Sequence, residues 1–125
     1  MIVLDAGALI ALDNNDRGMW TELKAAAEVA DVVVPLGALA QAWRGGGRQA
    51  RLSLALAGTT PASFDDLARE AGVLCARSDR PDVIDASVAL VAARPSTLAL
   101  YTSDKSDMDH LLATIGGHRP IVVAV

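Results

Sequence analysis

Two aspartates stand just after apolar segments of the kind that form buried strands. Asp5 directly follows Ile2–Leu4, and Asp104 follows the segment Thr97–Thr102 after one intervening residue. In open α/β sheets, ligands bind at the edge formed by the carboxyl ends of the strands. Carboxylates at both positions would therefore lie where a ligand binds.

Both aspartates also have a purely structural interpretation. Asp5 could cap a helical segment over Gly7–Leu12, because aspartate is a favoured N-cap residue. A serine beside Asp104 could cap the helix that follows, with Asp107 in its first turn. Taken one at a time, neither residue decides between a ligand site and a helix cap.

A third aspartate, Asp85, lies inside the apolar segment Val83–Ala93, which has no other charged residue. We expect this helix to begin at Pro81, so that Asp82 interacts with the helix dipole and Asp85 lies beyond the first turn. A buried carboxylate without a partner costs several kcal/mol, and a divalent cation would be a suitable partner. The other interpretation is an exposed stripe on the helix. Together with the two strand-end aspartates, Asp85 predicts a cation site.

Short apolar runs alternate with helical patterns along the chain. We expect strands at Ile2–Leu4, Val32–Val34, Thr59–Pro61, Thr97–Thr102 and Ile121–Val125. We expect helices over Trp20–Ala30, Ala38–Trp43, Gln49–Leu56, Phe64–Ala76 (capped by Ser63), Pro81–Ala93 and Asp107–Ile115. This alternation predicts one three-layer α/β/α domain over residues 1–125, with a short, mainly parallel sheet of roughly five strands.

Composition excludes several classes of protein. The chain has 125 residues and a net charge of −4, so it is not a basic nucleic-acid coat protein. The single cysteine, Cys75, excludes an internal disulfide framework and a zinc site made of cysteines. We recognise neither a signal peptide nor an apolar run long enough to span a bilayer, and we expect a cytoplasmic protein that does not bind membranes.

Three segments resemble the acidic motifs of PIN-domain ribonucleases, and most closely the VapC-type toxins of toxin–antitoxin pairs. They are Val3–Ile10, Val83–Ala86 and Thr102–Asp107, and their order and spacing fit nearly the whole chain. The resemblance implies a PIN-like parallel sheet and an acidic cluster that holds Mg²⁺ or Mn²⁺ and cleaves RNA. It assigns catalysis and metal binding to Asp5, Asp85 and Asp104, with Asp107 as an accessory acid.

The sequence departs from the family pattern at Gln41, where the family usually has a glutamate. An amide oxygen can ligate a metal or hold a metal-bound water, but it brings no charge. We expect Gln41 to weaken metal affinity and slow the reaction. An inert PIN-fold module, retained for binding antitoxin or RNA, is therefore the alternative function. A phosphoacceptor receiver domain is excluded, because no aspartate ends the third predicted strand.

Three arginines, Arg44, Arg48 and Arg51, lie near the glycine run Gly45–Gly47 and form a candidate RNA-binding patch. A solvated basic face, or a docking site for an acidic partner, remains the alternative. The resemblance further implies a homodimer, a cognate VapB-like antitoxin laid across the site, and an RNA substrate, with transfer RNA among the candidates.

Overall fold

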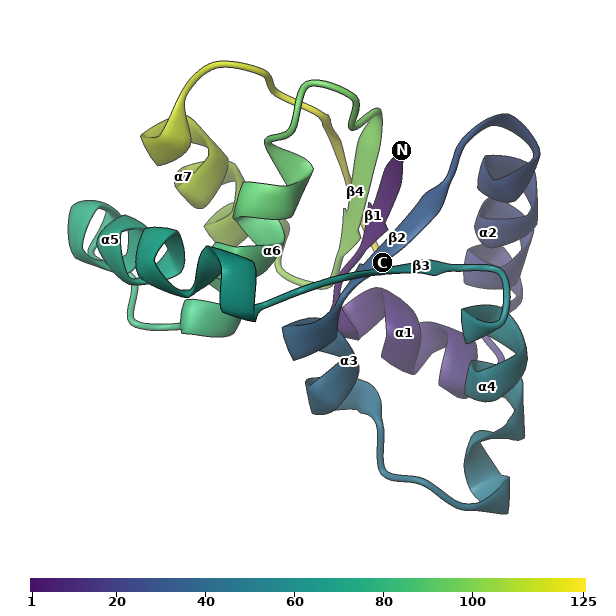
Figure 1. Cartoon of the computed structure of the whole chain (residues 1–125). Coiled ribbons are helices and arrows are strands. Elements are labelled where there is room, and N and C mark those ends of the chain that lie inside the picture. Colours follow the sequence, from purple (N-terminus) through teal and green to yellow (C-terminus); the bar gives the residue numbers. More distant parts are fainter.

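Five parallel strands form one sheet at the centre of the molecule (Figure 1). The computed structural model describes residues 1–125. The strands lie in the order β3-β2-β1-β4-β5, and every neighbouring pair is parallel. Their bounds are β1 (Ile2–Leu4), β2 (Val32–Pro35), β3 (Thr60–Ala62), β4 (Ala99–Thr102) and β5 (Ile121–Ala124). The predicted parallel sheet is confirmed.

Helices cover both faces of the sheet (Figure 1). One layer holds α1 (Ala6–Asp13), α2 (Arg17–Val29) and α4 (Ala50–Leu56), and the other holds α5 (Ala68–Ser78), α6 (Val83–Ala92) and α7 (Lys105–Ile115). Helix α3 (Leu36–Ala42) follows β2 and contributes to both layers, because Ala38 packs in one core and Ala42 in the other. The three-layer α/β/α architecture is confirmed.

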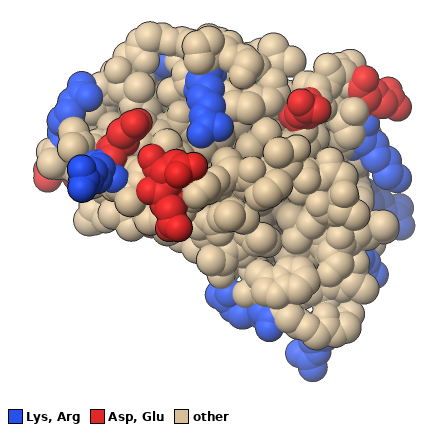
Figure 2. All heavy atoms as spheres, viewed as in Figure 1, with Lys and Arg blue, Asp and Glu red and all other residues tan.

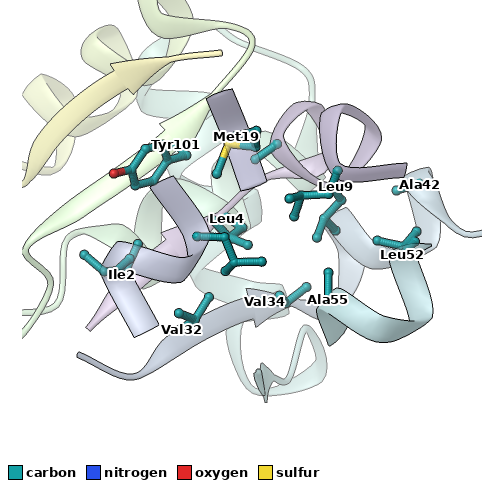
Figure 3. Close-up of a cluster of buried hydrophobic side chains, with 14 of the residues drawn as sticks. Ile2, Leu4, Leu9, Met19, Val32, Val34, Ala42, Leu52, Ala55 and Tyr101 are labelled. Atoms are coloured by element: carbon teal, nitrogen blue, oxygen red, sulfur yellow. The ribbon is translucent and has the colours of Figure 1, made fainter. Parts of the chain in front are cut away.

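The strands are apolar throughout because both of their faces are covered. Ile2 and Leu4 point into the core beneath α1, α2 and α4, while Val3 between them points into the opposite core. Figure 3 shows the first of these cores, with Leu4 on the strand side and Leu9 and Leu52 on the helices. The small cross-section of alanine lets the helices approach the sheet closely.

The structure differs from the predicted elements mainly at the ends of helices. The predicted set lacks α1, because its residues are apolar on nearly every side and show no amphipathic period. Helix α6 begins at Val83 instead of Pro81, since Asp82 is its cap. Ser63 makes no cap hydrogen bond, and a 3₁₀ turn over Asp65–Leu67 replaces the first turn of the predicted helix. Another 3₁₀ turn (Gly47–Gln49) leads into α4.

The strand order reverses between β1 and β4. From β1 the chain proceeds outward to β2 and β3, crosses to β4 on the other side of β1, and ends at β5. Leu4 pairs with Tyr101, so the carboxyl ends of β1 and β4 are adjacent. Ligands of open α/β sheets bind at such a switch point. The topology therefore brings Asp5 and Asp104 to the same edge of the sheet.

Charges are interspersed over the surface drawn in Figure 2, where small acidic and basic groups alternate and neither sign covers the face. No helix combines the length and the apolar character that crossing a bilayer requires.

Candidate metal centre

Asp5 is a buried residue at the junction of β1 and α1, with 6% of its surface exposed. Its backbone N–H donates to the carbonyl of Tyr101 on β4 at 3.1 Å, which continues the sheet by one residue. Its carboxylate accepts from the N–H of Ala8 at 3.1 Å and caps α1. The cap interpretation of Asp5 is thus correct. Capping occupies only part of a carboxylate's acceptor capacity, so it leaves a ligand role open.

Asp104 is the N-cap of α7, a position that the sequence interpretation gave to a neighbouring serine. Its carboxylate accepts from the N–H of Asp107 at 3.4 Å, and its own N–H donates to Oγ1 of Thr102 at 3.0 Å. The Thr102 hydroxyl also lies near enough to the carboxylate of Asp5 to lower its pKa. Thr102, the last residue of β4, is therefore a neighbour of both strand-end aspartates.

Asp85 is the third residue of α6 and lies in its first turn, not beyond it as the sequence interpretation assumed. Asp82 caps the helix and accepts from the N–H groups of Ile84 and Asp85, at 2.9 and 3.0 Å. Asp82 is thus the cap of α6 and not, as the sequence interpretation assumed, a residue of its first turn. The N–H of Asp85 is therefore occupied, while its carboxylate has no hydrogen bond or ion pair in the structure.

Asp85, Asp104 and Asp107 each offer a carboxylate oxygen, and these three oxygens lie within 4.8 Å of one another. Asp85 is half-buried, Asp104 is exposed, and Asp107 is half-buried. Asp5 stands outside this group of three, although its charge reaches Asp85. We call Asp5, Asp85, Asp104 and Asp107 the acidic cluster.

Electrostatics within the acidic cluster are unfavourable. Burial raises the pKa of Asp85 to about 6, and the charges of Asp82, Asp104, Asp5 and Asp107 contribute to the increase in that order. Burial also raises the pKa of Asp5, against the opposing effect of hydrogen bonds from Thr102 and backbone amides. Carboxylates held together in this way favour a bound cation, because the cation offsets both the burial and the repulsion.

The donor set fits a hard divalent cation. All four side chains of the acidic cluster offer carboxylate oxygens, which Mg²⁺ and Mn²⁺ prefer. Two oxygens on one Mg²⁺ are at most about 4.2 Å apart, so small side-chain rotations would bring the three oxygens into one coordination sphere. The histidines lie elsewhere: His110 contacts the carbonyl of Ser78 at 2.7 Å, and His118 contacts that of Thr97 at 2.6 Å. Neither histidine belongs to the group of three carboxylate oxygens.

Arg80 is a member of this region that sequence reasoning missed. Its Nε lies 3.2 Å from Oδ1 of Asp107 and forms an ion pair with it. The two residues are 27 positions apart and belong to different parts of the fold, so no short-range sequence pattern predicts their ion pair. Asp79, which precedes Arg80, has the left-handed conformation (φ 56°) and ends α5.

Gln41 is exposed on α3 and makes no hydrogen bond to the acidic cluster. Its helix nevertheless adjoins α6: a side-chain carbon at Gly37 would collide with Ile84, the neighbour of Asp85. Gln41 lies one helical turn after Gly37 and so on the same side of α3. Gln41 therefore lies on the side of α3 that adjoins the helix of Asp85.

The three arginines of the predicted RNA-binding patch have different local surroundings in the structure. The guanidinium of Arg44 donates to the carbonyls of Ala40 and Trp43, at 3.3 and 2.7 Å, and so covers the end of α3. Arg51 instead lines a hollow of about 480 Å³ between α2 and α4, together with Arg17 and Lys24. Arg48 is exposed in the 3₁₀ turn before α4. An RNA-binding role for these residues stays a prediction.

Comparison with models of known protein families and with curated proteins gave no match. The fold and the acidic cluster described above are therefore the basis for a functional proposal.

Proposed function

We propose that this protein is a metal-dependent endoribonuclease of the PIN-domain type. The observation that carries the proposal is the meeting of Asp85, Asp104 and Asp107 within 4.8 Å at the switch point of a parallel sheet, beside the buried Asp5. These are the aspartates of the three motifs that resemble the PIN family. A group of hard oxygen ligands at this edge suits a cation that binds a phosphodiester.

A bound Mg²⁺ or Mn²⁺ would supply a polarised phosphate and a water of lowered pKa. Asp85 and Asp104 would be its principal ligands, since their carboxylate oxygens lie within 4.8 Å of each other and carry no competing ion pair. Asp5 would supply charge from the buried side of the cluster, where the N–H of Ala8 holds its carboxylate. Asp107 would act as an accessory acid, because one of its oxygens is bound by Arg80.

Cleavage of an unstructured RNA in Mn²⁺ tests the proposal. We expect cleavage by the wild type, none with EDTA, and a loss of at least a hundredfold in Asp85→Asn and Asp104→Asn. The matched control is Asp31→Asn, which removes an exposed carboxylate from the turn before β2 and should leave the rate unchanged. Cleavage that persists in both cluster variants would come from a contaminant and would refute the proposal.

The biological setting follows from the VapC-like motifs. We infer a toxin that acts in the cytoplasm as a homodimer and is neutralised by a VapB-like antitoxin. An apolar groove of about 360 Å³, lined by Leu36, Leu39, Ala40, Trp43 and Leu56, offers an antitoxin a docking surface beside α3. If a small gene for a DNA-binding protein lies directly upstream, co-expression with its product should yield a stable complex that no longer cleaves RNA.

The alternative function is a PIN-fold module without catalysis, retained to bind antitoxin or RNA. Two observations favour it: Gln41 brings no charge, and Arg80 already neutralises Asp107. Such a module would bind antitoxin or RNA but would show no Mn²⁺-dependent cleavage at any protein concentration.

A further inference from the structure

We propose that Arg80 binds a phosphate oxygen of the RNA at the edge of the acidic cluster. This inference rests on the proposed function, because it assigns the group that receives the substrate of that same site. It concerns a residue that lies outside the three aspartate motifs.

The first support is the unused hydrogen-bonding capacity of Arg80. A guanidinium has five N–H donors in a planar fork. In the structure Nε donates to Oδ1 of Asp107 at 3.2 Å, and Nη1 has one long contact with the carbonyl of Asp79 at 3.5 Å. Nη2 has no partner, and 41% of the side chain is exposed. The ion pair therefore orients the guanidinium and leaves donors free for an anion.

The second support is the rigid attachment of Arg80. Its N–H donates to the carbonyl of Cys75 at 3.3 Å, at the left-handed end of α5. Two residues later, Asp82 caps α6. Arg80 thus lies between two fixed helix ends, and its guanidinium is held beside Asp107 at little further entropic cost.

The third support is the charge balance of the site. A phosphodiester that approaches the acidic cluster meets several negative charges, so it needs cationic contacts in addition to a metal. Arg80 is the one Lys or Arg side chain that forms an ion pair with any member of the acidic cluster. The nearby Lys105 and Arg119 are both paired with Asp109. Arginine also suits a phosphate with two free oxygens, because its fork can donate in parallel.

The experiment compares Arg80→Gln, Arg80→Lys and Arg77→Gln. Arg77 is the matched control, an exposed arginine at the end of α5 whose guanidinium bonds the carbonyl of Thr114 and not the acidic cluster. Two measurements are made on each folded protein. Mn²⁺ binding without RNA is measured by calorimetry, and the affinity for a fluorescent 12-nucleotide RNA in Mn²⁺ is measured by anisotropy at early times on ice. Where cleavage occurs, kcat and KM are measured separately.

We expect Arg80→Gln to weaken RNA binding, and to raise KM, by about tenfold, with Mn²⁺ binding unchanged or tighter. The RNA affinity of Arg80→Lys should lie between those of the wild type and Arg80→Gln, because lysine keeps the positive charge but lacks the planar set of N–H donors of a guanidinium. Arg77→Gln should match the wild type. Equal RNA affinity in Arg80→Gln and Arg77→Gln would overturn the inference. A loss of Mn²⁺ binding in Arg80→Gln would also overturn it, because Arg80 would then act only by positioning Asp107.

The two proposals fail in different ways. If the wild type binds RNA but cleaves none, the nuclease proposal falls, and a selective loss of RNA affinity in Arg80→Gln still supports the phosphate contact. If the wild type cleaves RNA and Arg80→Gln retains the wild-type KM, the nuclease proposal stands and the role of Arg80 falls.

Discussion

Gly7 in the first turn of α1 packs directly against Ser103, the residue between β4 and Asp104. A side-chain carbon at position 7 would collide with both side-chain atoms of Ser103 and lie 2.9 Å from its backbone nitrogen. The absence of a side chain at Gly7 therefore allows the two strand-end segments that carry Asp5 and Asp104 to approach each other.

We expect Gly7→Ala to push these segments apart and to lower the free energy of unfolding by about 1–3 kcal/mol, the usual cost of inserting a methyl group into a packed contact. Urea unfolding measures the change. The control is Gly72→Ala in α5, where an added side-chain carbon meets no atom within 4 Å. Because alanine favours a helix, that variant should be more stable by about 0.5–1 kcal/mol. Equal effects of the two substitutions would contradict the close approach at Ser103.

The stability of the metal-free protein should depend on pH through Asp85. Its pKa is raised from 3.8 to about 6 on folding, so the folded state binds the proton more tightly than the unfolded state does. Below pH 4 both states are protonated and no cost arises, whereas stability is lost as the pH rises from about 4 to 6. Because Asp85 is only half-buried, solvent reduces the loss to the order of 1 kcal/mol.

Asp85→Asn should therefore stabilise the protein in EDTA at pH 7 by on the order of 1 kcal/mol, and this gain should shrink toward zero at pH 4. Urea unfolding of the wild type and the variant at both pH values gives the double difference. Asp31→Asn should show no such dependence. A gain that is the same at both pH values would mean that burial and repulsion at Asp85 are not its cause.

Divalent metal should stabilise the wild type by relieving repulsion in the acidic cluster. At a Mn²⁺ concentration a hundred times the dissociation constant, the gain is about 2.7 kcal/mol, which raises Tm by several degrees. Asp104→Asn should lose most of this shift, and chelation with EDTA should reverse it. If Mn²⁺ shifts the Tm of wild type and variant equally, the metal binds somewhere else.

Gln41→Glu should strengthen metal binding several-fold by adding a charge on the side of α3 that adjoins α6. Calorimetry with Mn²⁺ measures the affinity, and RNA cleavage should increase with it. Glu at the neighbouring exposed position, Ala40→Glu, controls for a general gain in negative charge. Unchanged affinity and unchanged cleavage in Gln41→Glu would show that Gln41 does not attenuate this site.

Gln49, in contrast to Gln41, should matter for stability. It is buried, and its Oε1 accepts from the N–H groups of Arg44 and Gly45, at 2.6 and 2.8 Å. Its Nε2 donates to the carbonyl of Ala42 at 2.9 Å. Gln49→Ala leaves these groups without a partner and should cost about 2–4 kcal/mol in urea unfolding, whereas Gln41→Ala should cost less than about 0.5 kcal/mol. A similar loss of unfolding free energy in Gln49→Ala and Gln41→Ala would mean that Gln49 does not stabilise the segment around the glycine run Gly45–Gly47.

The sequence by itself determined the layers of the fold. Short apolar runs such as Ile2–Leu4 must be strands covered on both faces, and the helices between them require parallel connections. It also singled out Asp5 and Asp104, because an acid within two residues of the carboxyl end of a buried strand lies at the ligand-binding edge of the sheet. Local order along the chain is sufficient for these inferences.

Only the tertiary structure decided how the acids relate to one another. Strand order places β1 beside β4, and this adjacency cannot be read from chain order, since 94 residues lie between β1 and β4 in the sequence. The same holds for the pairing of Arg80 with Asp107 and for the exclusion of Asp5 from the group of three oxygens. Contacts between distant segments depend on packing of the whole molecule, whereas the propensity of each segment depends on its own few residues.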